Sequence, residues 1–123
     1  MDNHQFIIAQ GSTPILALAL PFEADADDVV FATFSQGDKN VLEYAMNGTA
    51  TAAIAGTGTL EIDEDDASTI VLAMTQEDTL GLTPGDAELQ IRIKHTDGEE
   101  VFTDTFVPLV GAVLKAYKTG VIT

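Results

Sequence analysis

The stretch that decides the fold class is LAMTQEDTLGLTPGDAELQIRIKHTDGEEVFTDTF, which runs from Leu72 to Phe106. Over 86–95, apolar residues alternate with polar ones, and this period of two predicts a half-buried β-strand. Pro84-Gly85 predicts a corner before this strand, and Asp97-Gly98 predicts a type I′ hairpin turn after it. A return strand follows over 99–107. The stretch therefore predicts the closing half of a small antiparallel β-domain.

A short helical turn is expected just before this corner. Thr75 is followed three residues later by Asp78, which resembles a capping box in which Asp78 reaches back to the Thr75 amide. We expect the turn to cover 76–82, with Leu80 and Leu82 packed inward and Pro84 ending it.

The rest of the chain extends the same pattern. Leu16, Leu18 and Leu20 share one face of a predicted strand, and a hairpin is expected around Gln36–Asn40. The further predicted strands cover 5–9, 14–20, 29–35, 41–46, 59–63 and 68–75, with 109–118 as a last edge strand or a tail. Residues 49–59, rich in Ala, Thr and Gly, fit an edge strand, a loop or an insertion, and Gly56-Thr57-Gly58 is interpreted as a flexible turn.

About seven or eight short strands separated by turns predict an all-β fold, an antiparallel immunoglobulin-like β-sandwich. With 123 residues, the chain is expected to form one domain over 1–123, with 1–4 and 119–123 as frayed ends. The Cys-Trp-Cys pattern of true immunoglobulin domains is absent from the sequence, which contains neither residue type.

Composition excludes several classes of function. Twenty acidic residues against five basic ones give a formal net charge of -15, so we expect no nucleic-acid partner and no anionic membrane partner. The absence of cysteine excludes disulfides, thiolate zinc sites and a thiol nucleophile. No signal peptide is recognisable, and no apolar run approaches the ~20 residues that a spanning helix needs.

Two acidic runs are the candidates for a metal site. Asp63, Asp65 and Asp66, with Glu64 between them, could offer oxygen ligands to calcium, and Asp25, Asp27 and Asp28 form a similar run. Neither run has the glycine and the closing glutamate of an EF-hand loop. We interpret both runs as solvated loops, with Asp63, Asp65 and Asp66 as weak candidates for a divalent cation.

No catalytic constellation emerges from the other residues. His4 and His95 are far apart in sequence, and His95 is interpreted as a structural residue of the hairpin turn. A glycosidase-like carboxylate pair would need aromatic platforms, but the chain has no Trp and only Tyr44 and Tyr117. We expect no enzymatic activity and no cofactor.

Positive charge is concentrated late in the chain. Before Ser68 the one basic residue is Lys39, whereas Arg92, Lys94, Lys115 and Lys118 follow it. Arg92 and Lys94 fall on one face of the alternating strand, so they are the candidate interface residues, with a solvated strand face as the alternative interpretation.

The layout resembles the N-terminal immunoglobulin-like domain of upper baseplate proteins, among the tail and baseplate proteins of phages and prophages of Gram-positive bacteria. The resemblance is firm over 68–108 and rests on the segments Gln10-Gly11-Ser12-Thr13, Leu72–Thr79, Pro84-Gly85, Ala87–Ile93 and Asp97-Gly98, with the ending Leu114-Lys115…Gly120-Val121-Ile122. It implies a structural protein of a virion and carries over no binding residues.

We therefore expect a non-enzymatic virion component, made in the host cytoplasm, whose partners are copies of itself or other virion proteins. The sequence leaves tail, baseplate and head locations open, and a head-decoration protein is one alternative. The other alternative is an immunoglobulin-like module that binds a carbohydrate or a host surface, with calcium held by the acidic loops.

Overall fold

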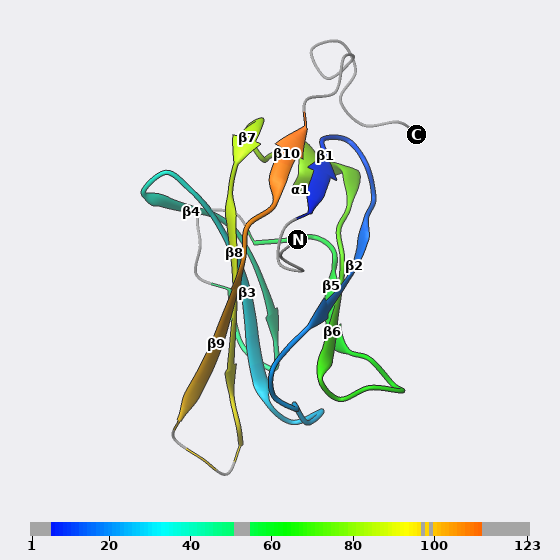
Figure 1. Cartoon of the computed structure of the whole chain (residues 1–123), viewed down its shortest axis with the longest axis vertical. Coiled ribbons are helices and arrows are strands. Elements are labelled where there is room, and N and C mark those ends of the chain that lie inside the picture. The colour runs from blue at the N-terminus through cyan, green and yellow to red at the C-terminus, as the bar shows by residue number, and fades with distance from the viewer. Residues whose placement is uncertain (1–5, 51–54, 97, 99, 112–123) are drawn as a thin grey trace.

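The computed structural model describes residues 6–50, 55–96, 98 and 100–111. Two layers of β-sheet face each other, and a third, smaller sheet closes one end (Figure 1). The strands are β1 (Ile7–Ala9), β2 (Ile15–Ala19), β3 (Val29–Gln36), β4 (Lys39–Met46), β5 (Thr59–Ile62), β6 (Thr69–Ala73), β7 (Gly85–Asp86), β8 (Glu88–Lys94), β9 (Val101–Phe106) and β10 (Leu109–Gly111). One helix, α1 (Gln76–Leu80), lies between β6 and β7.

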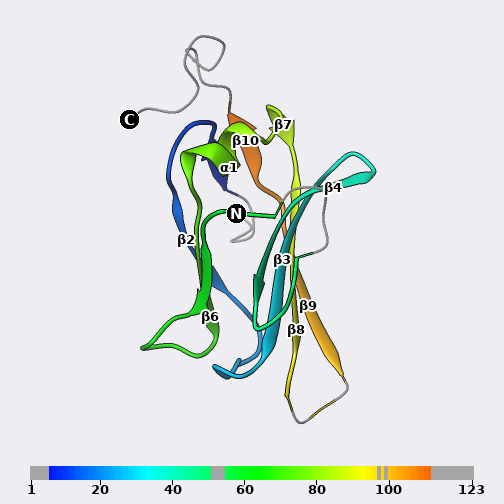
Figure 2. The same ribbon diagram turned by 180° about the vertical axis from the view of Figure 1, so that it is seen from behind.

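The larger sheet has the order β4-β3-β8-β9, and the opposing sheet has the order β2-β6-β5, with every pairing antiparallel. These orders correspond to strands C′-C-F-G and B-E-D of the immunoglobulin fold. Figures 1 and 2 show the two layers from opposite sides, with α1 bridging them at one end. The predicted immunoglobulin-like sandwich is therefore confirmed.

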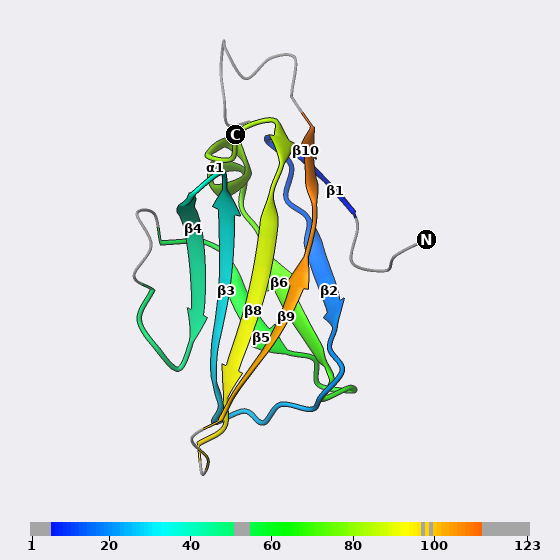
Figure 3. The same ribbon diagram turned by 60° about the vertical axis from the view of Figure 1, so that its left-hand side comes forward.

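The smallest sheet was not predicted. It has the order β1-β10-β7, and β1 pairs with β10 in parallel, with Ile7 opposite Leu109 and Ala9 opposite Gly111. In a constant-type immunoglobulin domain the first strand pairs with strand B. Here β1 lies against β10 instead, and β2 is the edge strand of its own sheet among the described residues (Figure 3).

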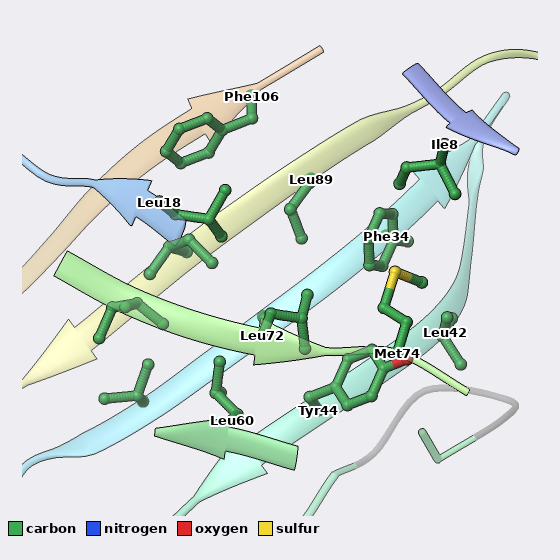
Figure 4. Close-up of a cluster of buried hydrophobic side chains, with 14 of the residues drawn as sticks. Ile8, Leu18, Phe34, Leu42, Tyr44, Leu60, Leu72, Met74, Leu89 and Phe106 are labelled. Carbon is green, nitrogen blue, oxygen red and sulfur yellow. The ribbon is translucent and has the colours of Figure 1, made fainter. Parts of the chain in front are cut away.

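Alternation along the strands builds the core. The inward faces of β3, β8, β2 and β6 place large apolar side chains between the layers, as Figure 4 shows for part of the cluster. The fully buried members with under 2 % exposure include Ile8, Val30, Phe34, Ile70, Leu72, Leu82, Leu89, Ile91 and Ile93. The predicted inward faces of 14–20, 68–75 and 86–95 are thus confirmed, except that Leu16 is only half-buried.

The helical turn and its corner match the prediction in outline. Thr75 caps α1 by accepting the Asp78 amide at 3.2 Å, but the helix ends at Leu80, two residues before the predicted end. Leu82 is buried, whereas Leu80 is only half-buried. Gly85 has a φ of 125°, a conformation that residues with a Cβ rarely adopt, so this corner requires glycine.

Candidate docking surface

The acidic candidates Asp63, Asp65 and Asp66 lie in the loop between β5 and β6, where they shape the turn. Asp63 Oδ1 accepts the Asp65 amide at 3.0 Å. Asp66 accepts the hydroxyl and the amide of Ser68 and the hydroxyl of Thr69. These hydrogen bonds, those from Ser68 first, lower the pKa of the Asp66 carboxyl. The loop therefore already has a structural use for its carboxylates.

A different group of potential ligands does converge. Asp25, Asp28 and His95 each bring one ligand atom within 4.8 Å of the others. Asp28 is 1 % exposed, and its Oδ2 lies 2.7 Å from His95 Nδ1 and 2.8 Å from the Asp25 amide nitrogen. His95 also packs edge-on against Phe102, with ring centroids 5.4 Å apart. This geometry ties the loop before β3 to the end of β8, in keeping with the structural role expected for His95.

The candidate interface residues Arg92 and Lys94 share the outer face of β8. Arg92 lies over the Phe31 ring, 5.3 Å from its centroid, and its Nη2 is 3.9 Å from Glu43 Oε2. Glu43 is buried at 3 % exposure and accepts the Thr33 hydroxyl at 2.6 Å. Arg92 is therefore engaged within its own chain, while Lys94 is exposed.

Asp78 is a buried carboxylate that joins the two layers, which is not the role predicted for it from the sequence. The Asp78 side chain does not complete a capping box. Its oxygens accept the Tyr44 hydroxyl, the Thr57 amide (2.9 Å to Oδ2), the Thr57 hydroxyl (2.9 Å) and the Gly58 amide (3.1 Å). Burial raises the pKa of the Tyr44 hydroxyl, and the hydrogen bond to Asp78 raises it further.

The interpretation of Gly56-Thr57-Gly58 as a flexible turn is wrong, because backbone hydrogen bonds fix this segment in place. The Gly56 amide donates to the Glu43 carbonyl at 2.8 Å, and the next two amides donate to Asp78. A Cβ on Gly56 would overlap the Tyr44 ring, and one on Gly58 would overlap the Ala73 carbonyl oxygen. Glycine is required here for close approach rather than for flexibility.

The side of the sandwich opposite Asp78 and the Gly56-Thr57-Gly58 segment exposes apolar side chains. Ile7 is 70 % exposed and Ile15 is 73 % exposed, and Leu109 and Val107 are also exposed. Scattered exposed residues are ordinary, but a contiguous apolar patch marks an interaction site. The patch was missed from sequence because it combines the ends of three strands. The signal that could have indicated it is Ile15, a large apolar residue on the face opposite the leucines of β2.

Two adjoining hollows give this patch its shape. The first, about 480 Å³, lies between β2 and the end of β9 and is lined by apolar side chains that include Phe6, Ile7, Ile15, Leu16, Leu18 and Phe106. The second, about 550 Å³, shares Phe6 and Ile7 and extends to Val107, Leu109 and Asp86. We call this surface the open side.

The rings of Phe6 and Phe106 meet edge-to-face in the first hollow, with centroids 6.4 Å apart. The floor of the open side is therefore continuous with the core, because Leu18 and Phe106 also belong to the buried cluster in Figure 4. A hydrophobic segment seated there would extend the core of the domain.

Comparison with known proteins gives no relative: the chain matches no protein-family model and no curated protein. The helix of the described residues has five residues and is too short and too polar to cross a membrane.

Proposed function

We propose that the protein is a non-enzymatic structural component of a phage or prophage virion, from the tail or baseplate region, that acts by self-assembly or by docking to a neighbouring virion protein. The virion assignment rests on the sequence resemblance over 68–108. The mode of action rests on one observation: two isoleucines more than two-thirds exposed rim an apolar hollow at a sheet edge.

Several features of the described residues support assembly over chemistry. The carboxylates with buried or convergent geometry, Asp28, Glu43 and Asp78, all accept hydrogen bonds from groups within the chain. They hold loops and strands together. The apolar open side lies apart from them and has no such internal role.

Light scattering coupled to size exclusion, across a range of protein concentrations, tests this proposal. We expect a discrete oligomer from the unaltered chain and at least a tenfold weaker association for the double variant Ile7→Ser/Ile15→Ser. Val101→Ser is the matched control, because Val101 is 53 % exposed but lines neither hollow. Equal loss of association in the control, or a monomer at every concentration, would count against self-assembly through the open side.

The calcium-dependent ligand module remains the alternative for the acidic loops. It predicts a rise in melting temperature on addition of calcium that is lost in an Asp63→Asn/Asp65→Asn variant. The existing hydrogen bonds of these carboxylates make this alternative the less supported one.

A further inference from the structure

The backbone of β2 is arranged to accept another strand. The Leu20 amide donates to the Ser68 carbonyl at 2.8 Å, and the Met74 amide donates to the Pro14 carbonyl at 3.0 Å. Hydrogen-bonded and non-hydrogen-bonded pairs alternate along an antiparallel ladder. The backbone N–H and C=O groups of the even-numbered residues of β2 therefore point toward β6. The peptide groups of Ile15, Ala17 and Ala19 therefore point to the open edge. Among the described residues, β6 is the one strand that pairs with β2, so no described strand pairs with these peptide groups.

This edge lies directly over an apolar floor. Leu16 and Leu18 of β2 line the hollow, together with Phe106 of β9 and Phe6, which precedes β1. A strand added at the edge would therefore gain main-chain hydrogen bonds from β2 and burial for one alternate face of its side chains. An occupant needs an extended segment with small or apolar residues on one face.

Residues 112–118, AVLKAYK, have this pattern. Ala112, Leu114 and Ala116 alternate with Val113, Lys115 and Tyr117, so one face carries a single large apolar residue between two small ones. Leu114 is of a size to enter the hollow between Leu16 and Phe106.

Charge also favours this segment. All twenty acidic residues of the chain precede Gly111, whereas Lys115 and Lys118 follow it. The open side is flanked by carboxylates: Asp86 lines the second hollow, and Asp104 lies on β9 two residues before Phe106. A basic strand therefore approaches an acidic body with complementary charge.

Chain direction points to a second molecule as the acceptor. β10 ends at Gly111 beside Ala9, at the end of the sandwich from which β2 runs back in the opposite direction (Figures 1 and 3). To reach its own β2, the chain would have to reverse after Gly111. The sequence from Ala112 to Thr119 contains none of the turn formers Gly, Pro, Asn, Asp and Ser.

We propose that residues 112–118 of one copy add as a strand to β2 of a second copy, with Leu114 seated in the apolar hollow. This proposal rests on the proposed assembly function and specifies its contact. The contact is heterologous, since donor and acceptor are different surfaces, so repeated addition generates a ring or an open chain of copies.

Two full-length variants separate donor from acceptor. Leu114→Asp places a charge where the donor side chain enters the hollow. Ala17→Pro removes an amide at the open edge without removing a bond to β6. We expect each variant alone to be monomeric by light scattering at concentrations where the unaltered chain assembles. Ala17→Ser keeps the amide and should assemble normally.

An equimolar mixture of the two variants gives the sharpest result. The Ala17→Pro chain still donates and the Leu114→Asp chain still accepts, so we expect a 1:1 heterodimer that grows no further. Circular dichroism establishes that each variant is folded, and Ala19→Pro tests the same edge if Ala17→Pro does not fold.

Assembly of either single variant like the unaltered chain would overturn strand addition. If Ile7→Ser/Ile15→Ser is monomeric in that case, the assembly function stands and only the strand contact fails. An unaltered chain that stays monomeric at every concentration would overturn both the contact and self-assembly.

Discussion

The two lateral sides of this sandwich differ in how the two layers meet. On the side of β4 and the 55–58 segment, a buried polar cluster joins the layers: Asp78 accepts from Tyr44, Thr57 and Gly58. On the open side, between β2 and β9, apolar side chains line a hollow and two isoleucines are exposed. The polar side is closed by contacts within the chain, and we call it the closed side; the apolar side is the surface proposed to contact another copy.

The difference separates stability from assembly. A buried carboxylate with several donors is costly to disturb, because each donor left without an acceptor keeps its desolvation penalty. An exposed apolar rim contributes little to folding but gains on contact with a partner. Substitutions on the closed side should therefore change the free energy of unfolding, and substitutions on the open side should change association.

Asp78→Ala should have the largest effect on stability. It leaves the Tyr44 hydroxyl and the Thr57 and Gly58 amides without their acceptor, so we expect a loss of about 3 kcal/mol or more in the free energy of unfolding. Urea denaturation measures this loss. The matched control is Asp66→Ala, which removes a carboxylate that accepts three hydrogen bonds on an exposed turn.

The control should change stability much less than Asp78→Ala, since water replaces the lost acceptor at an exposed site. Similar losses for the two variants would mean that burial does not set the energetic value of the Asp78 cluster.

The surroundings of Asp78 could be predicted from the sequence only in part. The Thr75 cap and the alternation of 86–95 are local patterns, and the structure confirms both. The partners of Asp78 come from positions 20, 21 and 34 residues away, so its capping-box role was assigned from the nearest amide alone. A buried carboxylate takes the acceptor geometry that the whole fold offers, which no local pattern specifies.

The open side shows the same limit. A strand over 5–9 was predicted, but its partner was not. Pairing of β1 with β10 rather than with β2 depends on contacts between segments far apart in the sequence. This pairing leaves β2 at the edge of its sheet. The candidates Arg92 and Lys94 were chosen by charge, whereas the contact that the geometry favours is apolar and lies elsewhere.

A pair of identical substitutions compares the two sides directly. Gly58→Ala puts a Cβ into the Ala73 carbonyl oxygen on the closed side, whereas Gly111→Ala places one 4.0 Å from Ile7 Cγ2 on the open side. We expect Gly58→Ala to cost about 1–3 kcal/mol of unfolding free energy, as overpacking does. Gly111→Ala should stay within about 0.5 kcal/mol. Equal effects on the urea midpoint would contradict the contrast between the two sides.

Among the substitutions expected to destabilise the Asp78 side of the sandwich, Tyr44→Phe should have the smallest effect, and that effect depends on pH. At neutral pH we expect a loss of about 1 kcal/mol, the typical net value of one hydrogen bond. Burial and Asp78 raise the pKa of Tyr44 in the folded chain above the value of about 10 in the unfolded chain, so the folded state holds this proton more tightly. The stabilisation is therefore complete below about pH 10 and declines as the pH rises further.

Lysines titrate in both the unaltered chain and the Tyr44→Phe variant, so the difference in unfolding free energy between the two isolates the contribution of Tyr44. Urea denaturation from pH 8 to pH 11 should show the advantage of the unaltered chain shrinking at the alkaline end, and a constant difference would show that the Tyr44 proton is not held by this cluster.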